Sequence, residues 1–115
     1  MKTLEAVKQA RIPKEKAILV FCPQTYNKEA KLNIRVFADL YGVPEDPATG
    51  SANGCLAGYL VKHRYFGKDQ INIRVEQGYE IGRPSLLLLK AEGKEEKIDV
   101  HVGGTVVMIA KGELV

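Results

Sequence analysis

EDPATGSANG, residues 45–54, is a turn that leads directly into a helix, and the rest of the fold is organised around it. Asp-Pro favours a turn, Thr49 is a suitable N-cap, and Gly50 relaxes the backbone where the helix begins. The first N–H groups of a helix have no partner inside it, and the helix dipole makes this end positive, so it can bind an anion. Asp46 and Ser51 stand beside these groups, with small neighbours that leave room for a ligand. The stretch predicts a carboxylate or phosphate site, with a plain turn and helix cap as the alternative.

The helix is predicted over residues 51–64, because apolar residues recur there at helical spacing and form a single face. These residues are Ala52, Cys55, Leu56, Tyr59 and Leu60. Gly54 and Gly58 lie one turn apart, so a neighbouring element can approach the helix backbone closely. So many small residues favour a helix that is buried in the interior.

Six segments are predicted as strands, because their apolar residues run together or alternate with polar ones. They cover residues 17–22, 32–36, 71–75, 86–89, 98–102 and 106–110, with turns at 92–94 and 103–104 and a short helix over 4–11. The predicted fold class is α+β: a mostly antiparallel sheet rolled around one central helix.

The composition describes one globular domain, residues 1–115, with 45% hydrophobic and 27% charged residues. The net charge is only +3, and opposite charges interleave, so the basic stripe of a nucleic-acid-binding protein is not seen.

Cys22 and Cys55 match no metal or redox spacing and are expected to be buried thiols, and two histidines make a zinc site improbable. The longest apolar run, residues 86–89, is too short to cross a bilayer, and we expect a cytoplasmic protein.

A second candidate segment is QGYEIGRPS, residues 77–85, which joins two predicted strands. Two glycines, a proline and Arg83 indicate a loop of defined shape, and loops of this kind often carry functional residues. A wide hairpin with a surface arginine is an equally good interpretation.

Together these motifs resemble the phenazine-biosynthesis PhzF-like family. The resemblance rests on residues 35–37, 42–52, 77–78, 82–85, 102–104 and 112–114, and it extends from about Thr3 onward. It implies a diaminopimelate-epimerase-like fold of two pseudo-symmetric α+β domains, each a sheet rolled around a helix. It also implies an active site in the cleft between the domains and catalysis without metal or organic cofactor.

By the same resemblance, Asp46 and Ser51 are the expected catalytic residues of a general acid–base proton transfer on a small carboxylated substrate. The expected substrate-binding residues are Thr49, Gly50, Ser51, Ala52, Gly82 and Arg83, with the amides of Gly50 and Ser51 on the carboxylate. The family's main glutamate belongs to an N-terminal domain, whereas this chain resembles only the C-terminal half.

Three hypotheses follow for the function of the chain. It is half of an isomerase completed by a separate N-terminal-half chain, or it is completed by a second copy in a homodimer. Alternatively, it is a non-catalytic domain that binds a carboxylate or phosphate at the helix N-terminus. We expect neither nucleic acid nor a membrane as a partner.

Overall fold

The computed structural model describes residues 17–115, so the predicted helix over 4–11 lies outside the described residues. One α-helix, α2 (Gly50–Lys62), is found in this part of the chain, close to the predicted bounds. The strands are β1 (Ile18–Cys22), β2 (Leu32–Ala38), β3 (Val43–Asp46), β4 (Gln70–Gln77), β5 (Ser85–Lys94) and β6 (Lys97–Gly104). Short 3-10 helices, η1 (Asp39–Tyr41) and η2 (Tyr79–Ile81), follow β2 and β4.

The strands form one mixed sheet in the order β1-β2-β4-β5-β6, with β3 paired to β2. Neighbouring strands are antiparallel except for β2 and β4, which run parallel. A parallel pair needs a crossover connection, and here the chain passes through η1, β3 and α2 between the two strands. The α+β class with a mostly antiparallel sheet is therefore confirmed.

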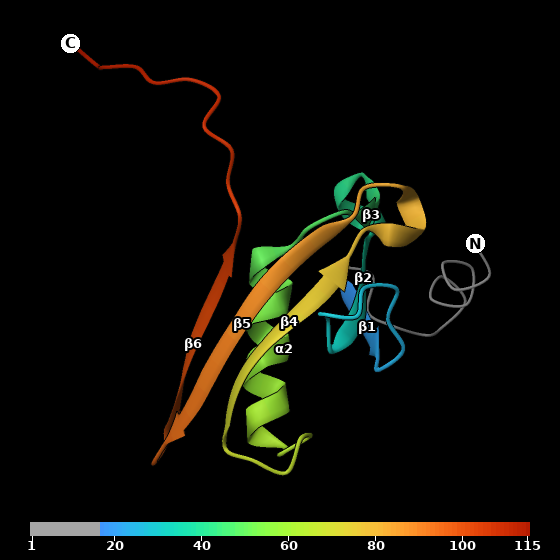
Figure 1. The fold of residues 1–115 in the computed structure, drawn as a ribbon, viewed down its shortest axis with the longest axis vertical. Helices are drawn as coiled ribbons and strands as arrows, with labels where there is room; N and C mark the ends of the chain where they lie inside the picture. The colour runs from blue at the N-terminus through green and yellow to red at the C-terminus, as the bar shows by residue number, and fades with distance from the viewer. Residues whose placement is uncertain (1–16) are drawn as a thin grey trace.

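The core lies between α2 and one face of the curved sheet, as Figure 1 shows. The alternation predicted from the sequence puts every second residue of β2, β4 and β5 on this face. Its buried members are Leu32, Ile34, Val36, Ile71, Val75, Leu87, Leu89 and Ala91, which pack against Leu56, Ala57, Leu60 and Val61 of the helix. Gly54 and Gly58 face β6, where an added Cβ would meet Val100 at 3.9 Å in both cases.

The sheet covers α2 on one side and does not enclose it, so the expectation of a buried helix was wrong. Cys55 and Tyr59 are exposed, although the sequence assigned them to the core face. The buried face is rotated from the predicted one because it contains Asn53, Ala57 and Val61 with Leu56 and Leu60. Cys22 is exposed as well, so both predicted buried thiols are surface cysteines.

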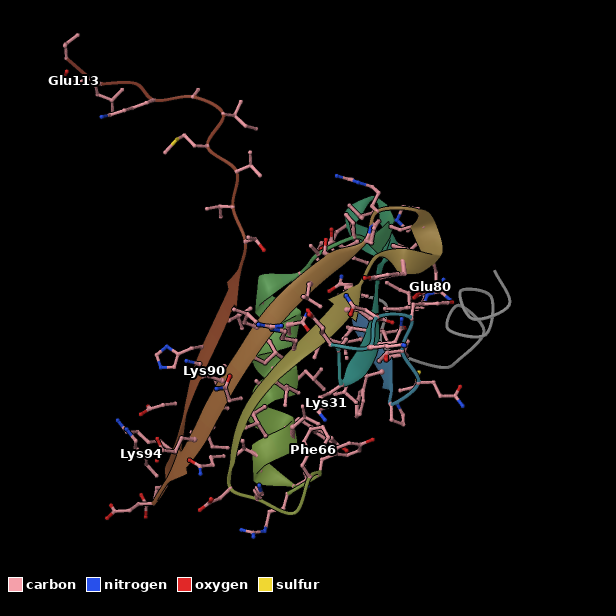
Figure 2. All side chains as sticks on the ribbon, viewed as in Figure 1. Lys31, Phe66, Glu80, Lys90, Lys94 and Glu113 are labelled. Atoms are coloured by element: carbon pink, nitrogen blue, oxygen red, sulfur yellow. The ribbon has the colours of Figure 1, made fainter. Side chains whose placement is uncertain are left out.

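The segment after β6 forms no strand, so the strand predicted over 106–110 was wrong. Residues 105–115 run away from the body of the protein (Figures 1 and 2), and all of their side chains are exposed. The predicted turns were also displaced. The β5–β6 hairpin turns at Glu95 and Glu96, with a φ of 50° at Glu95, and Gly103 and Gly104 belong to β6.

Candidate functional site

The predicted site is the turn between β3, which ends at Asp46, and α2, which begins at Gly50. Asp46 is fixed to the sheet because it pairs with Val36 of β2. Thr49 occupies the N-cap position in an extended conformation, but its side chain makes no capping hydrogen bond. Its hydroxyl instead donates to Oδ2 of Asp46. The threonine that was expected to cap the helix therefore binds Asp46, and its side chain does not cap the first N–H groups of α2.

Gln77, at the end of β4, holds this turn in place. Its Nε2 donates to the carbonyl oxygen of Asp46 at 2.8 Å and to Oγ1 of Thr49 at 3.0 Å. Its Oε1 accepts from the backbone N–H of Thr49 at 3.3 Å and from Nδ2 of Asn53 at 2.8 Å. Gln77 and Asn53 are both fully buried. The side-chain amide of Gln77 thus uses both of its ends to join the turn, the first turn of α2 and β4.

Gly78 brings the second motif against the first. An added Cβ there would lie 2.7 Å from the carbonyl oxygen of Pro47 and would also collide with the carbonyl of Arg83. Its φ of 84° is in the left-handed region that favours glycine. The N–H of Arg83 closes the loop by donating to the Gly78 carbonyl oxygen at 2.8 Å. The two segments singled out in the sequence therefore form one structural unit.

The helix start lies between two hollows. The first, of about 670 Å³, brings together four predicted site residues, Asp46, Thr49, Ser51 and Ala52. Its remaining lining is mainly apolar: Ala17, Leu19, Val36, Ala38, Tyr41, Val43 and Cys55. A helix start can bind an anion, so its position beside Asp46 in an apolar hollow would suit a small ligand that has one carboxylate and an apolar body.

The second hollow, of about 510 Å³, is lined by Gly50 together with Pro84 and Ser85 of the second motif. Gly82 and Arg83 line neither hollow and are exposed. The loop after β4 therefore lies beside the helix start, but the side chain of Arg83 does not enter either hollow.

Two other acids near the turn have structural partners. Glu45 accepts two hydrogen bonds from Arg35, at 2.7 Å and 3.1 Å, in a largely buried ion pair. This hydrogen bonding to Glu45 raises the pKa of Arg35. Glu76 is fully buried and accepts from the N–H groups of Tyr26 and Asn27 and from Nδ2 of Asn33, each at 2.8 Å. Of these three acids, Asp46 is the one that lines the first hollow.

A third hollow, of about 570 Å³, lies on β4, β5 and β6 and is lined in part by Lys90, Lys94 and His101. Figure 2 shows Lys90 and Lys94 along β5 at the lower left of the view, away from the β3–α2 turn. None of the predicted site residues reaches it. In residues 17–115, no group of three or more His, Cys, Asp and Glu side chains is arranged to hold a metal ion.

Sequence reasoning missed the roles of Gln77 and Asn53. A signal for Gln77 was present, since the inward alternation of Ile71, Ile73 and Val75 reaches residue 77 two positions later. A glutamine at an inward position must find hydrogen-bond partners. For Asn53, burial was decided by how the helix rotates against the sheet, and the sequence carried no such signal.

No helix of the described part of the chain combines the length and the apolar character that crossing a membrane requires. The sequence matches the family described as phenazine biosynthesis-like protein (PhzC-PhzF) over residues 4–112. It is 46% identical over 84 residues to a trans-2,3-dihydro-3-hydroxyanthranilate isomerase of Pseudomonas fluorescens, covering 70% of this chain and 29% of that protein. It is 34% identical over 111 residues to an uncharacterized isomerase of Clostridium acetobutylicum, covering 94% of this chain and 37% of that one.

The fold is similar to the crystal structure of a PhzF-family phenazine biosynthesis protein of Bacillus anthracis, with a TM-score of 0.71 and 28% sequence identity. This similarity covers 79% of the chain and 32% of that structure. The chain spans 29% and 37% of the length of the two relatives described above. Because the family match covers residues 4–112, the chain belongs to the phenazine biosynthesis-like protein family.

Proposed function

We propose that the chain supplies one wall of a PhzF-like isomerase that moves a proton on a small carboxylated substrate by general acid–base chemistry, without a cofactor. The observation that carries this proposal is the start of α2. Its Thr49 makes no side-chain cap, and Asp46 stands beside it in the same hollow as Ser51. The names of its relatives as isomerases support the reaction class.

In this proposal the backbone N–H groups of Gly50 and Ser51 bind the substrate carboxylate, since that end of the helix carries positive partial charge. Thr49 and Ala52 complete this end of the site. Asp46 and the Ser51 hydroxyl then face the carbon where the proton moves. Gly82 and Arg83 belong to the loop that Gly78 packs against the turn, and we assign them a part in shaping the site.

We also propose that the site is completed by a second copy or by a separate chain equivalent to the N-terminal half. The chain spans about a third of its relatives, at 29% and 37% of their lengths. Its C-terminal segment exposes apolar side chains: Val106, Val107, Met108 and Ile109 are each at least 80% exposed. Apolar surface of this kind marks an interaction site.

The test is solvent-deuterium incorporation into trans-2,3-dihydro-3-hydroxyanthranilate and related small carboxylates, followed by NMR in D₂O. The chain is assayed alone, at concentrations that span monomer and dimer, and after mixing with an N-terminal half from a family member. We expect Asp46→Asn and Ser51→Ala to abolish incorporation, and Glu92→Gln, an exposed change on β5, to leave it unchanged. Formation of a tight complex with no incorporation into any of these compounds would contradict the proposal.

The non-catalytic alternative is favoured by one observation: the helix start and its supporting residues all come from this chain. A carboxylate- or phosphate-binding domain would need nothing more. In that case, titration with benzoate or phosphate shifts the amide resonances of Gly50 and Ser51, while no assembly of the chain exchanges substrate protons.

A further inference from the structure

Gln77 does more than hold the turn, because it sets the direction of a chain of hydrogen bonds that ends on Asp46. We propose that Gln77 is a positioning residue that aims the Thr49 hydroxyl proton at Asp46. This inference rests on the proposed function in so far as Asp46 is a catalytic acid or base.

The chain has four members joined by three hydrogen bonds, and the two hydrogen bonds of Gln77 are 3.0 Å or shorter. Nδ2 of Asn53 donates to Oε1 of Gln77 at 2.8 Å, and Nε2 of Gln77 donates to Oγ1 of Thr49 at 3.0 Å. The Thr49 hydroxyl then donates to Oδ2 of Asp46. Asn53 and Gln77 are fully buried, so water does not compete for the first link.

Two backbone carbonyls decide the direction of this chain, because a carbonyl oxygen can only accept a hydrogen bond. The Asp46 carbonyl oxygen lies 2.8 Å from one end of the Gln77 amide, which must therefore be the NH₂ end. The Thr49 carbonyl oxygen lies 2.7 Å from the side-chain amide of Asn53 and fixes the NH₂ end of that group in the same way. The orientation of both amides is thus settled by the main chain.

The consequence falls on Thr49. Its Oγ1 faces an NH₂ group of Gln77 and must accept from it, so its own proton is left for Asp46. The Oδ2 atom of Asp46 is thereby held as an acceptor at a fixed position. In the proposed mechanism this leaves Oδ1 to exchange the proton with the substrate, and a rotation of the carboxylate would break the hydrogen bond to Thr49.

The substitution Gln77→Glu tests the direction, because it keeps the shape and replaces the NH₂ donor by an oxygen. The Thr49 hydroxyl then donates to the new carboxylate and turns away from Asp46. We expect kcat for proton exchange to fall about tenfold or more, the scale of one lost hydrogen bond to a charged group, with KM changed less than about threefold. Gln70→Glu, an exposed change on the same strand, is the matched control.

Thr49 provides a second test that keeps Gln77 and the core intact. Thr49→Val removes the hydroxyl and should lower kcat as Gln77→Glu does, whereas Thr49→Ser keeps the hydroxyl and should be at least about threefold faster than Thr49→Val. A purely structural role of Gln77 predicts instead that the melting temperature falls and that the two Thr49 variants have equal kcat. Equal rates would overturn the proposal.

A readout that needs no activity separates this proposal from the proposed function. NMR of the labelled chain should detect a slowly exchanging Thr49 hydroxyl proton and an isotope effect of that proton on the ¹³Cγ resonance of Asp46. Both signals should be lost in Gln77→Glu and kept in Gln70→Glu. If both signals are present while no substrate exchanges its proton, the proposed function fails and the positioning role of Gln77 stands. If both signals persist in Gln77→Glu, the positioning role of Gln77 is wrong.

Discussion

The turn between β3 and α2 and the segment after β6 are both irregular, but they differ in where their contacts come from. Every polar group of the Gln77 side chain is used to hold the turn, and Gly78 lets two carbonyls approach it closely. Residues 105–115 have no such support within the described part of the chain, and Ile109 is 92% exposed. One region is specified by residues of this chain, and the other exposes apolar surface that suits an outside partner.

The turn is held by side chains of this chain, so changes there should cost stability in the isolated chain. Changes in the C-terminal segment should cost association and leave stability alone.

Among changes around the β3–α2 turn, the largest loss of stability is expected for Gly78→Ala. The added Cβ collides with the carbonyls of Pro47 and Arg83, and the φ of 84° is unfavourable for alanine. We expect the free energy of unfolding to fall by about 3 kcal/mol, or the chain not to fold, as measured by urea denaturation.

Gly82→Ala is the matched control for this change. Gly82 also has a positive φ, 70°, but an added Cβ would meet nothing within 4 Å. Its cost should be limited to about 1 kcal/mol of backbone strain. Equal losses for the two variants would mean that the contact between the two motifs does not stabilise the turn.

Glu76→Gln should have the next largest effect. The buried carboxylate accepts three hydrogen bonds, two of them from the backbone of Tyr26 and Asn27. In the glutamine variant an NH₂ group, which cannot accept a hydrogen bond, faces one or more of these donors. We therefore expect the free energy of unfolding to fall by about 2 kcal/mol in the same denaturation experiment. Glu92→Gln, which is exposed on β5, should stay within about 0.5 kcal/mol of the wild type, and a similar loss there would point to a general charge effect.

The sequence predicted the sheet better than the helix because alternation has a short, unambiguous period. Ile71, Ile73 and Val75 fall on the inward face of β4 as expected, and Asn72 and Arg74 between them are exposed. In the helix, Cys55 and Tyr59 are apolar enough to fit a core face, and so are Ala57 and Val61. Which set is buried depends on how far the sheet curves, which no local pattern encodes.

The sequence predicted where the candidate site lies but not which side chains hold it in place. The sequence predicted the turn at Asp46 and Pro47 and the glycine at the helix start, because each of these residues acts through its own backbone. The sequence did not predict that Thr49 donates to Asp46, because this hydrogen bond depends on Gln77. Gln77 is 28 residues away from Thr49 and reaches the turn only through the parallel pairing of β2 and β4.

A small, pH-dependent effect is expected at the far end of the sheet. The hydrogen bond from Lys94 lowers the pKa of Asp99, with a distance of 2.8 Å between Nζ and Oδ2. A lowered pKa in the folded state means that this contribution to stability is present at neutral pH and is lost as the pH falls through that pKa. Asp99→Asn should therefore melt slightly lower than the wild type at pH 7, and the difference should shrink as the pH falls below the ordinary range of aspartate pKa values.

The side chains of Lys94 and Asp99 are 52% and 38% exposed, so solvent and salt screen the pair. The difference at pH 7 should shrink in about 1 M salt, where the screening length is about 3 Å. A difference that persists at low pH and high salt would show that Asp99 acts through packing of the hairpin and not through its charge.

The smallest effect on stability is expected for Ile109→Lys, in the exposed segment. This side chain has little contact to lose, so the free energy of unfolding should stay within about 0.5 kcal/mol of the wild type. Leu89→Ala, at a fully buried position of β5, should cost about 3 kcal/mol in the same assay. If Ile109→Lys destabilises the dilute monomer, the segment packs on its own domain. If Ile109→Lys leaves the stability of the monomer unchanged and abolishes association in sedimentation, the apolar side chains of the segment contact a partner. A charge at position 109 is costly only where a second surface removes it from water.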